Sequence, residues 1–425
     1  MVPIRRPLRV VMCICLTYFA VPRLLPSQTF TTLYNFGKTS SDGSRATGRL
    51  LVSNNGVLYG TTYYGGAYGK GTVFTLTPPA SAGGVWTEEV IWSFGASGDG
   101  IGPEGGVVIG NGGCSTCPNV VLGLTESGGG YGTGMCYSLI APTSRGGTWT
   151  ESPIWPYGFG HNPRTTWAEA ADGTLFASTY SGGSYNGGTI VSLYQPAGAW
   201  AGAYIWSFGS GADGRYPEGR LAMDANGIVY GTTRQGGAGG GGIVFSLIPP
   251  VVYGGTGTES VIWNFQNRDG DLRSPDSGVV VGAGGVLYGT TPTGGGGNLG
   301  VVFSLTPPPA TGDPWTMATI ASFGRHSIAG WDPEGGLLLS TQTGKLYGTT
   351  AFGPAVTGSN GYGTVFELTP PASPGGVWGL RSLHQFVGSD GARSYAGLTQ
   401  ANDVLYGVTT DGGAYGQGTV FSIAP

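Results

Sequence analysis

Carboxylates and tyrosines recur at fixed places along this chain of 425 residues. Tyrosine offers a flat apolar surface with a polar tip, and carboxylates accept hydrogen bonds from hydroxyl groups or bind Ca²⁺. Together they predict recognition of a polysaccharide or protein ligand. The candidate residues are the aspartates of Asp-Gly pairs (Asp42, Asp99, Asp213, Asp269, Asp390), the glutamates of Pro-Glu-Gly (Glu104, Glu218, Glu334) and the tyrosines of glycine-rich loops (Tyr68, Tyr131, Tyr185, Tyr362, Tyr415).

A structural interpretation of both sets stays open. Asp-Gly is a turn dipeptide, because aspartate can bond to its own backbone two residues on. The tyrosines could simply wedge neighbouring repeats apart. Repetition itself favours this interpretation, since a scaffold residue must recur and a site residue need not. We predict no resident cofactor or metal, although a Ca²⁺ ion would suit the carboxylates.

Catalysis is the alternative to binding. Two carboxylates roughly 5 to 10 Å apart across a cleft can hydrolyse a glycoside, and carboxylates on successive loops could reach that separation. A serine triad is not supported, since the chain has three histidines and no Gly-x-Ser-x-Gly before a helix. The sequence therefore favours a binding or adhesion module without catalysis. A polysaccharide hydrolase or lyase and a structural cell-surface component are the alternatives.

Cysteines are few and support no metal or redox centre. Cys114 and Cys117 lie in an insertion of the second repeat and are candidates for a small loop-closing disulfide. Zinc needs four ligands, and a redox pair needs a helix N-terminus, so both options are weaker. Cys136 stands where the first repeat has Val73 and is predicted to be a buried apolar residue.

Composition and the N-terminus indicate an exported protein. Charged residues make up 10% of the chain and its net charge is −4. The composition therefore gives no indication of the basic surface that nucleic-acid binding needs. Three arginines precede an apolar run of about a dozen residues, which is typical of a secretory signal. We interpret residues 1–28 as a signal peptide and residues 29–425 as one domain. The expected product is a secreted or cell-surface bacterial monomer with no membrane span in the mature chain.

A repeat organises the whole domain. The motif Leu-Tyr-Gly-Thr-Thr, or a variant of it, occurs seven times with a period of about 58 residues. Its central residue is Gly60, Gly123, Ala177, Gly231, Gly289, Gly348 and Gly407 in turn. Each repeat holds four strand-like runs, and the first two are joined by a tight turn such as Asn55-Gly56. No convincing helical periodicity appears outside the signal.

The order of the runs predicts a closed ring. The fourth type of run occurs first at residues 29–36, before any other, and the chain ends with a third run at residues 418–423. The N-terminal strand can therefore complete the last sheet and remove its free edge. We predict an all-β, seven-bladed β-propeller of four-stranded antiparallel blades, closed by the N-terminal strand. The alternative is a linear β-solenoid, which would not need this offset.

The motifs resemble a known repeat. Leu-Tyr-Gly-Thr-Thr, a double glycine, Gly-Thr-Val-Phe and Leu-Thr-Pro-Pro together are similar to the GloVer repeat, named for Gloeobacter and Verrucomicrobia. The similarity is strong in repeats one, four, five, six and seven and degraded in two and three. The resemblance implies an exported bacterial protein. It implies no activity and assigns no catalytic residues.

Overall fold

The computed structural model describes residues 28–81, 83–110, 120–144, 147–155, 161–195, 200–268, 271–310, 312–354, 360–373 and 375–425. Three predictions from the sequence lie outside these residues: the signal peptide up to residue 27, the Cys114–Cys117 disulfide and a site at Asp269. The described chain is all-β, and its only helical segment is a single 3-10 turn, Ala283–Gly285.

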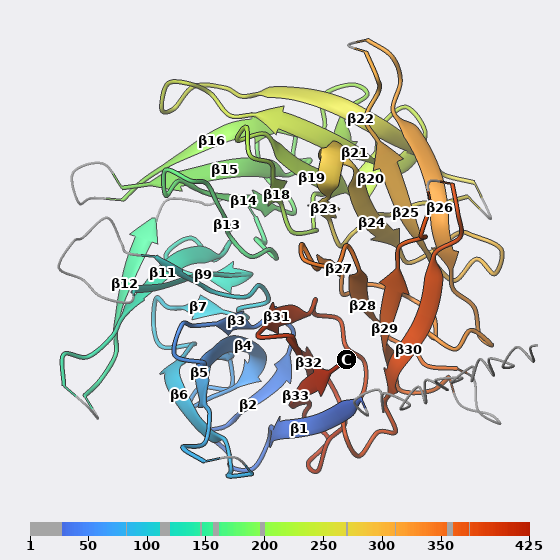
Figure 1. Cartoon of the computed structure of the whole chain (residues 1–425). Helices are drawn as coiled ribbons and strands as arrows, with labels where there is room; N and C mark the ends of the chain where they lie inside the picture. Colours follow the sequence, from blue (N-terminus) through green and yellow to red (C-terminus); the bar gives the residue numbers. More distant parts are fainter. Residues whose placement is uncertain are drawn as a thin grey trace, which may run out of the picture.

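Seven antiparallel sheets stand around one axis, which makes the protein a seven-bladed β-propeller (Figure 1). The first strands of several neighbouring blades contact one another, such as β18 with β23 and β23 with β27. From the axis outwards, blades one to seven are β3 (Leu51–Val52), β4 (Leu58–Gly65), β5 (Thr72–Thr77), β6 (Thr87–Ser93); β8 (Val108–Gly110), β9 (Val120–Thr125), β11 (Met135–Ile140), β12 (Thr150–Trp155); β13 (Ala168–Glu169), β14 (Leu175–Thr179), β15 (Thr189–Tyr194), β16 (Ala201–Ser207); β18 (Ala222–Met223), β19 (Val229–Thr233), β21 (Gly240–Ile248), β22 (Thr258–Gln266); β23 (Val279–Val281), β24 (Leu287–Thr291), β25 (Val301–Thr306), β26 (Thr316–Ser322); β27 (Leu337–Leu339), β28 (Leu346–Thr350), β29 (Thr364–Thr369), β30 (Gly379–Gln385); and β31 (Thr399–Ala401), β32 (Val404–Thr409), β33 (Thr419–Ala424), β1 (Thr29–Asn35). Five short strands lie in the loops: β2 (Gly43–Ala46), β7 (Gly100–Ile101), β10 (Ser127–Gly128), β17 (Gly214–Arg215) and β20 (Gln235–Gly236). β2 pairs with β4, β7 pairs with β10, and β20 pairs with both β17 and β21.

The first and last strands of the described chain close the ring. β1 pairs antiparallel with β33, from Thr29 opposite Ala424 to Asn35 opposite Thr419. In Figure 1 the blue N-terminal strand lies beside the red C-terminal one. The hydrogen bonds of β33 are thus satisfied on both sides, so this blade has the same four strands as the others. The predicted closure is confirmed, and the solenoid alternative is wrong.

The glycine of Leu-Tyr-Gly-Thr-Thr makes room for an aromatic ring on the next strand. Gly348 lies opposite the buried Phe366, and a Cβ atom on this glycine would come within 2.5 Å of the phenyl Cζ. The same pairing recurs as Gly60–Phe74, Gly231–Phe245, Gly289–Phe303 and Gly407–Phe421. In blade three Ala177 replaces the glycine, and its partner is the smaller Val191. Side-chain volume across the strand pair therefore decides which residue the motif can carry.

In blades one and six, a threonine of the same motif ties the blade to the loop of the next. The Thr61 hydroxyl donates a hydrogen bond to the carbonyl oxygen of Gly105 at 2.9 Å, and the Thr349 hydroxyl donates to Ala396 at 3.2 Å. These two carbonyls directly follow Glu104 and Tyr395 in the chain. The repeat motif thus positions residues at the axis of the neighbouring blade.

The loops between blades and the loops after each second strand lie on one face of the ring. The Gly66 amide donates to the Asp42 carbonyl oxygen at 3.0 Å, and the Gly102 amide donates to the Lys70 carbonyl oxygen at 2.9 Å. Each bond joins one loop of each kind. Both loop types therefore contribute side chains to the same end of the axis.

Candidate functional site

A cavity of about 630 Å³ lies on the axis and is lined by residues from all seven blades. Each blade contributes the equivalent residue of the loop before its first strand. We call this set the axial ring: Thr47, Glu104, Arg164, Glu218, Asp276, Glu334 and Tyr395. One position of the repeat thus carries three glutamates, an aspartate, an arginine, a tyrosine and a threonine.

The residues on either side explain how the loops come so close. Proline precedes the ring residue in blades two to six, and its fixed φ holds the loop in one direction. Glycine often follows it. A Cβ atom on Gly105 would overlap the carbonyl oxygen of Thr165 in the next blade. The proline and glycine of Pro-Glu-Gly therefore allow the loops to pack closely around the axis.

Arg164 connects three glutamates on one side of the ring. Its guanidinium group pairs with Glu218 at 3.0 Å, with Glu126 at 2.7 Å and with Glu104 at 3.4 Å. Glu126 reaches this ring from the loop that follows β9. Burial opposes the charge on Arg164, but the nearby glutamates raise its pKa, so the arginine remains a permanent cation.

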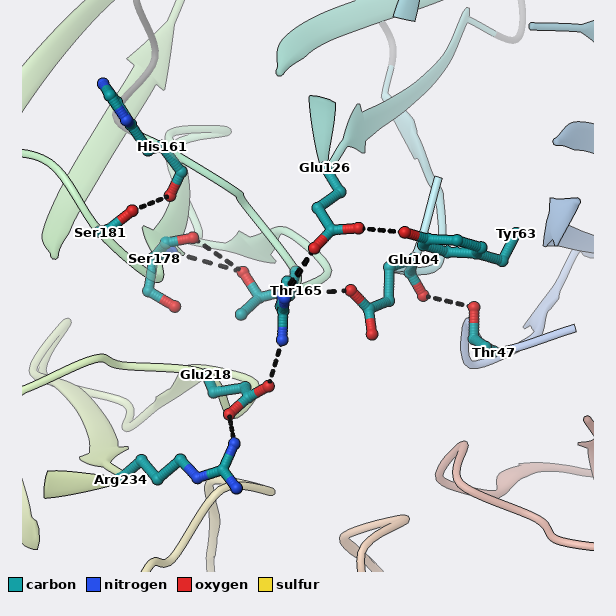
Figure 2. Close-up of polar contacts among 11 residues, drawn as sticks. Thr47, Tyr63, Glu104, Glu126, His161, Thr165, Ser178, Ser181, Glu218 and Arg234 are labelled. Atoms are coloured by element: carbon teal, nitrogen blue, oxygen red, sulfur yellow. Dashed lines mark hydrogen bonds and ion pairs between the residues drawn. The ribbon is translucent and has the colours of Figure 1, made fainter. Parts of the chain in front are cut away.

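The network extends further through Glu218 and Glu126, as Figure 2 shows. The second carboxylate oxygen of Glu218 pairs with Arg234 at 3.3 Å. The Tyr63 hydroxyl donates a hydrogen bond to Glu126. Glu218 therefore lies between two guanidinium groups and forms an ion pair with each.

The carboxyl groups on the other side of the ring have raised pKa values. Burial, followed by the nearby Glu218, raises the pKa of Asp276 to about 7. Burial, together with Asp332 and Asp276, raises the pKa of Glu334 to about 8. One carboxyl oxygen of Asp276 is buried and has no hydrogen-bond partner among the described residues. Near neutral pH these two groups carry protons for much of the time.

The cavity wall thus combines proton donors and a proton acceptor. Asp276 and Glu334 are proton-bearing acids, and Glu218 is an ion-paired carboxylate close enough to affect the pKa of both. Asp276 and Glu334 can supply protons to a bound molecule, and the Glu218 carboxylate offers a hydrogen-bond acceptor in the same wall.

The predicted aspartates lie elsewhere. Asp99 accepts hydrogen bonds from the Gly95 and Gly100 amides at 3.2 and 2.6 Å, and Asp213 accepts one from the Gly209 amide at 2.9 Å. Asp390 accepts one from the Val387 amide at 2.9 Å and lies 2.8 Å from His384 Nε2. These three aspartates each bond to their own loop, and none lines the axial cavity.

The predicted tyrosines lie on the loops of the same face and outside the axial cavity. All five remain about half exposed: Tyr68 56%, Tyr131 63%, Tyr185 52%, Tyr362 47% and Tyr415 51%. They are therefore free to contact a molecule that extends across this face.

Sequence reasoning noted Glu104, Glu218 and Glu334 but missed Arg164 and Asp276. The missed residues follow Pro163 and Pro275, at the register of Pro-Glu-Gly in the degraded or altered repeats. An alignment on that proline would have found them. Glu126 has no such signal, because its role depends on a loop of one blade reaching the arginine of the next.

Comparison with solved structures identifies other propellers. An ancestral GH74 enzyme matches with a TM-score of 0.56 and 14% identity over 93% of this chain and 50% of its own. The polysaccharide lyase Uly1 matches with a TM-score of 0.46 and 13% identity over 92% of both chains. The Hadza microbial sialidase Hz136 matches with a TM-score of 0.42 and 13% identity over 93% of this chain and 68% of its own. The chain thus spans half the length of the GH74 enzyme, and the likeness shows the fold.

These comparisons correct one expectation. The sequence favoured a binding or adhesion module without catalysis, and that expectation is corrected, because the fold is shared with an ancestral GH74 enzyme. The physical reason for the error is that the axial ring forms only when distant repeats meet, so the exposed tyrosines dominated the sequence pattern.

Among the described residues, no three histidines, cysteines, aspartates or glutamates are arranged to hold a metal ion. The same part of the chain has no helix that is long and apolar enough to cross a membrane.

No curated protein matches the sequence at a significant level. A family model does match it, over residues 118–323 and again over residues 251–425. The two matches together cover most of the chain and coincide with blades of the propeller. The protein therefore belongs to the Gloeobacter/Verrucomicrobia repeat family.

Proposed function

We propose that the protein is a carbohydrate-processing enzyme that hydrolyses glycosidic bonds at the axial ring. The observation that carries this proposal is the placement of Glu218, an ion-paired carboxylate, beside Asp276 and Glu334, whose pKa values are raised to about 7 and 8. The fold shared with a GH74 enzyme supports it. The cavity of about 630 Å³ has the size of a site for a few sugar units.

The proposed roles follow from the two environments. Glu334 gives its proton to the glycosidic oxygen as the bond from that oxygen to the anomeric carbon breaks. Glu218 takes a proton from the water that attacks the anomeric carbon. Each positioned proton transfer contributes about 10² to 10⁴ in rate. Asp276 keeps a second acid next to Glu334 and raises the pKa of the donor.

The rest of a long substrate would lie across the loop face. The five half-exposed tyrosines remain candidates for contacts with sugar rings there, because their flat faces bury apolar surface at low entropic cost. Export of the chain with removal of residues 1–28 fits this function, since the repeat family is one of exported bacterial proteins. An extracellular polysaccharide is then the accessible substrate.

The test is release of reducing ends from a panel of polysaccharides by the purified protein. We expect cleavage of at least one polymer, and a fall in kcat of about 10² to 10⁴ for Glu334→Gln and for Glu218→Gln. Glu89→Gln is the matched control, because Glu89 is exposed on the outer strand β6. The proposal fails if no polymer is cleaved, if either variant keeps the wild-type rate, or if the products carry the double bond of an elimination.

A further inference from the structure

Two arginines line the cavity below the axial ring. Arg49 and Arg220 follow the ring residues Thr47 and Glu218 by two positions, and both line the cavity. They come from blades one and four. The other blades place only small residues at this level: Gly106, Thr166, Gly278, Gly336 and Gly397.

Neither of these arginines has an acidic partner in the described part of the chain. The Arg49 Nε donates to the Thr399 hydroxyl at 3.1 Å, and Arg220 lines the cavity. Other arginines of the protein are paired, such as Arg381 with Glu367 and Arg393 with Asp411, both at 3.1 Å. Ion pairing within the fold therefore does not explain why Arg49 and Arg220, which we call the inner pair, line the cavity.

The surroundings of these two arginines disfavour their positive charge. Burial and the neighbouring Arg220 lower the pKa of Arg49 to about 9, and burial lowers the pKa of Arg220. A Cβ atom on Gly397 would come within 2.6 Å of the Gly335 carbonyl oxygen and 3.8 Å of the Arg49 Cδ, so only glycine fits where these loops meet beside Arg49. Two like charges facing an open, partly desolvated space are compensated when an anion occupies it.

We propose that Arg49 and Arg220 bind the oxyanion substituent of an acidic sugar, a carboxylate or a sulfate ester, within the axial cavity. This names the substrate class of the proposed hydrolysis and rests on that function. A guanidinium group offers two parallel donors to such an oxyanion, which neutral sugars lack. With its anion on the inner pair, the sugar would present its glycosidic oxygen to the axial ring above.

Calorimetric titration tests the pair directly, with glucuronate, inorganic sulfate and neutral glucose as probes. We expect glucuronate to bind, glucose not to bind, and affinity to fall as salt is added. Arg49→Gln and Arg220→Gln should each weaken binding about tenfold or more. Arg215→Gln is the matched control, since Arg215 is exposed in the same blade as Arg220 but outside the cavity. Arg49→Lys, which keeps the charge, should retain part of the affinity.

The outcomes separate this inference from the proposed hydrolysis. Binding is measured on Glu218→Gln protein as well, so it does not depend on turnover. The anion site is overturned if Arg49→Gln and Arg220→Gln both bind glucuronate as tightly as the wild type, or if glucose binds as well as glucuronate. Either result counts even if polymer cleavage is found. Sulfate binding that is lost in both variants while glucuronate does not bind supports the site with a sulfate ester as its source. A melting temperature like that of the wild type shows that the variants are folded.

Discussion

At the scale of residues, the axial ring differs from the scaffold in how its positions vary between repeats. The glycine and phenylalanine that face each other inside a blade recur in five blades, because their volumes must fit. The ring position instead changes from glutamate to arginine, aspartate, tyrosine and threonine. Such variety at one structural position indicates individual roles, and the raised pKa values of Asp276 and Glu334 are consistent with the proton transfer proposed above.

The buried Asp276 should lower the free energy of unfolding of the protein at high pH, where its carboxyl group ionises. Because its pKa is raised to about 7, the folded protein binds more protons than the unfolded chain between about pH 4 and about pH 7. Its contribution to stability is therefore full at low pH and is lost as the pH rises through 7. Asparagine cannot ionise, so Asp276→Asn should be more stable than the wild type by roughly 1–2 kcal/mol at pH 8, with no such gain near pH 3.

Urea unfolding of both proteins between these pH values measures the difference. Asp313→Asn serves as the control, because Asp313 is exposed and should show no such pH-dependent gain. A difference between Asp276→Asn and the wild type that does not change with pH would contradict the raised pKa.

At the scale of elements, the second and third strands of each blade are matched by volume. Gly348→Ala would place a methyl group within 2.5 Å of the Phe366 ring and should destabilise the protein by about 1–3 kcal/mol. The same change should cost less when Phe366 is replaced by valine, since Ala177 and Val191 already form that pair in blade three. A double-mutant cycle from urea unfolding measures the coupling. Additive costs for the two substitutions would refute the volume match.

At the scale of the whole molecule, the axial cavity exists because the ring is closed. Removal of β1 exposes the edge of β33 and opens blade seven, which carries Tyr395 of the axial ring. Exposed strand edges pair with other chains. A chain that begins at residue 37 should therefore associate or aggregate and lose any polysaccharide cleavage, whereas one that begins at residue 29 should not. Size-exclusion chromatography with light scattering compares the two, and a soluble, active monomer from residue 37 onwards would show that closure is dispensable.

Sequence alone determined the architecture, because its evidence is repeated inside the chain. The period of Leu-Tyr-Gly-Thr-Thr predicted seven units, the alternating runs predicted their strands, and the position of residues 29–36 predicted closure beside β33. These signals are local, or they follow from counting runs along one chain.

Only the tertiary structure decided where chemistry can occur. Glu218, Asp276 and Glu334 are about 58 residues apart in sequence, and they form one site because each blade turns its loop toward a common axis. Their pKa values depend on burial and on charges from other blades, which no local pattern contains. For the same reason, only the folded ring shows that Arg49 and Arg220 line one cavity and affect each other electrostatically.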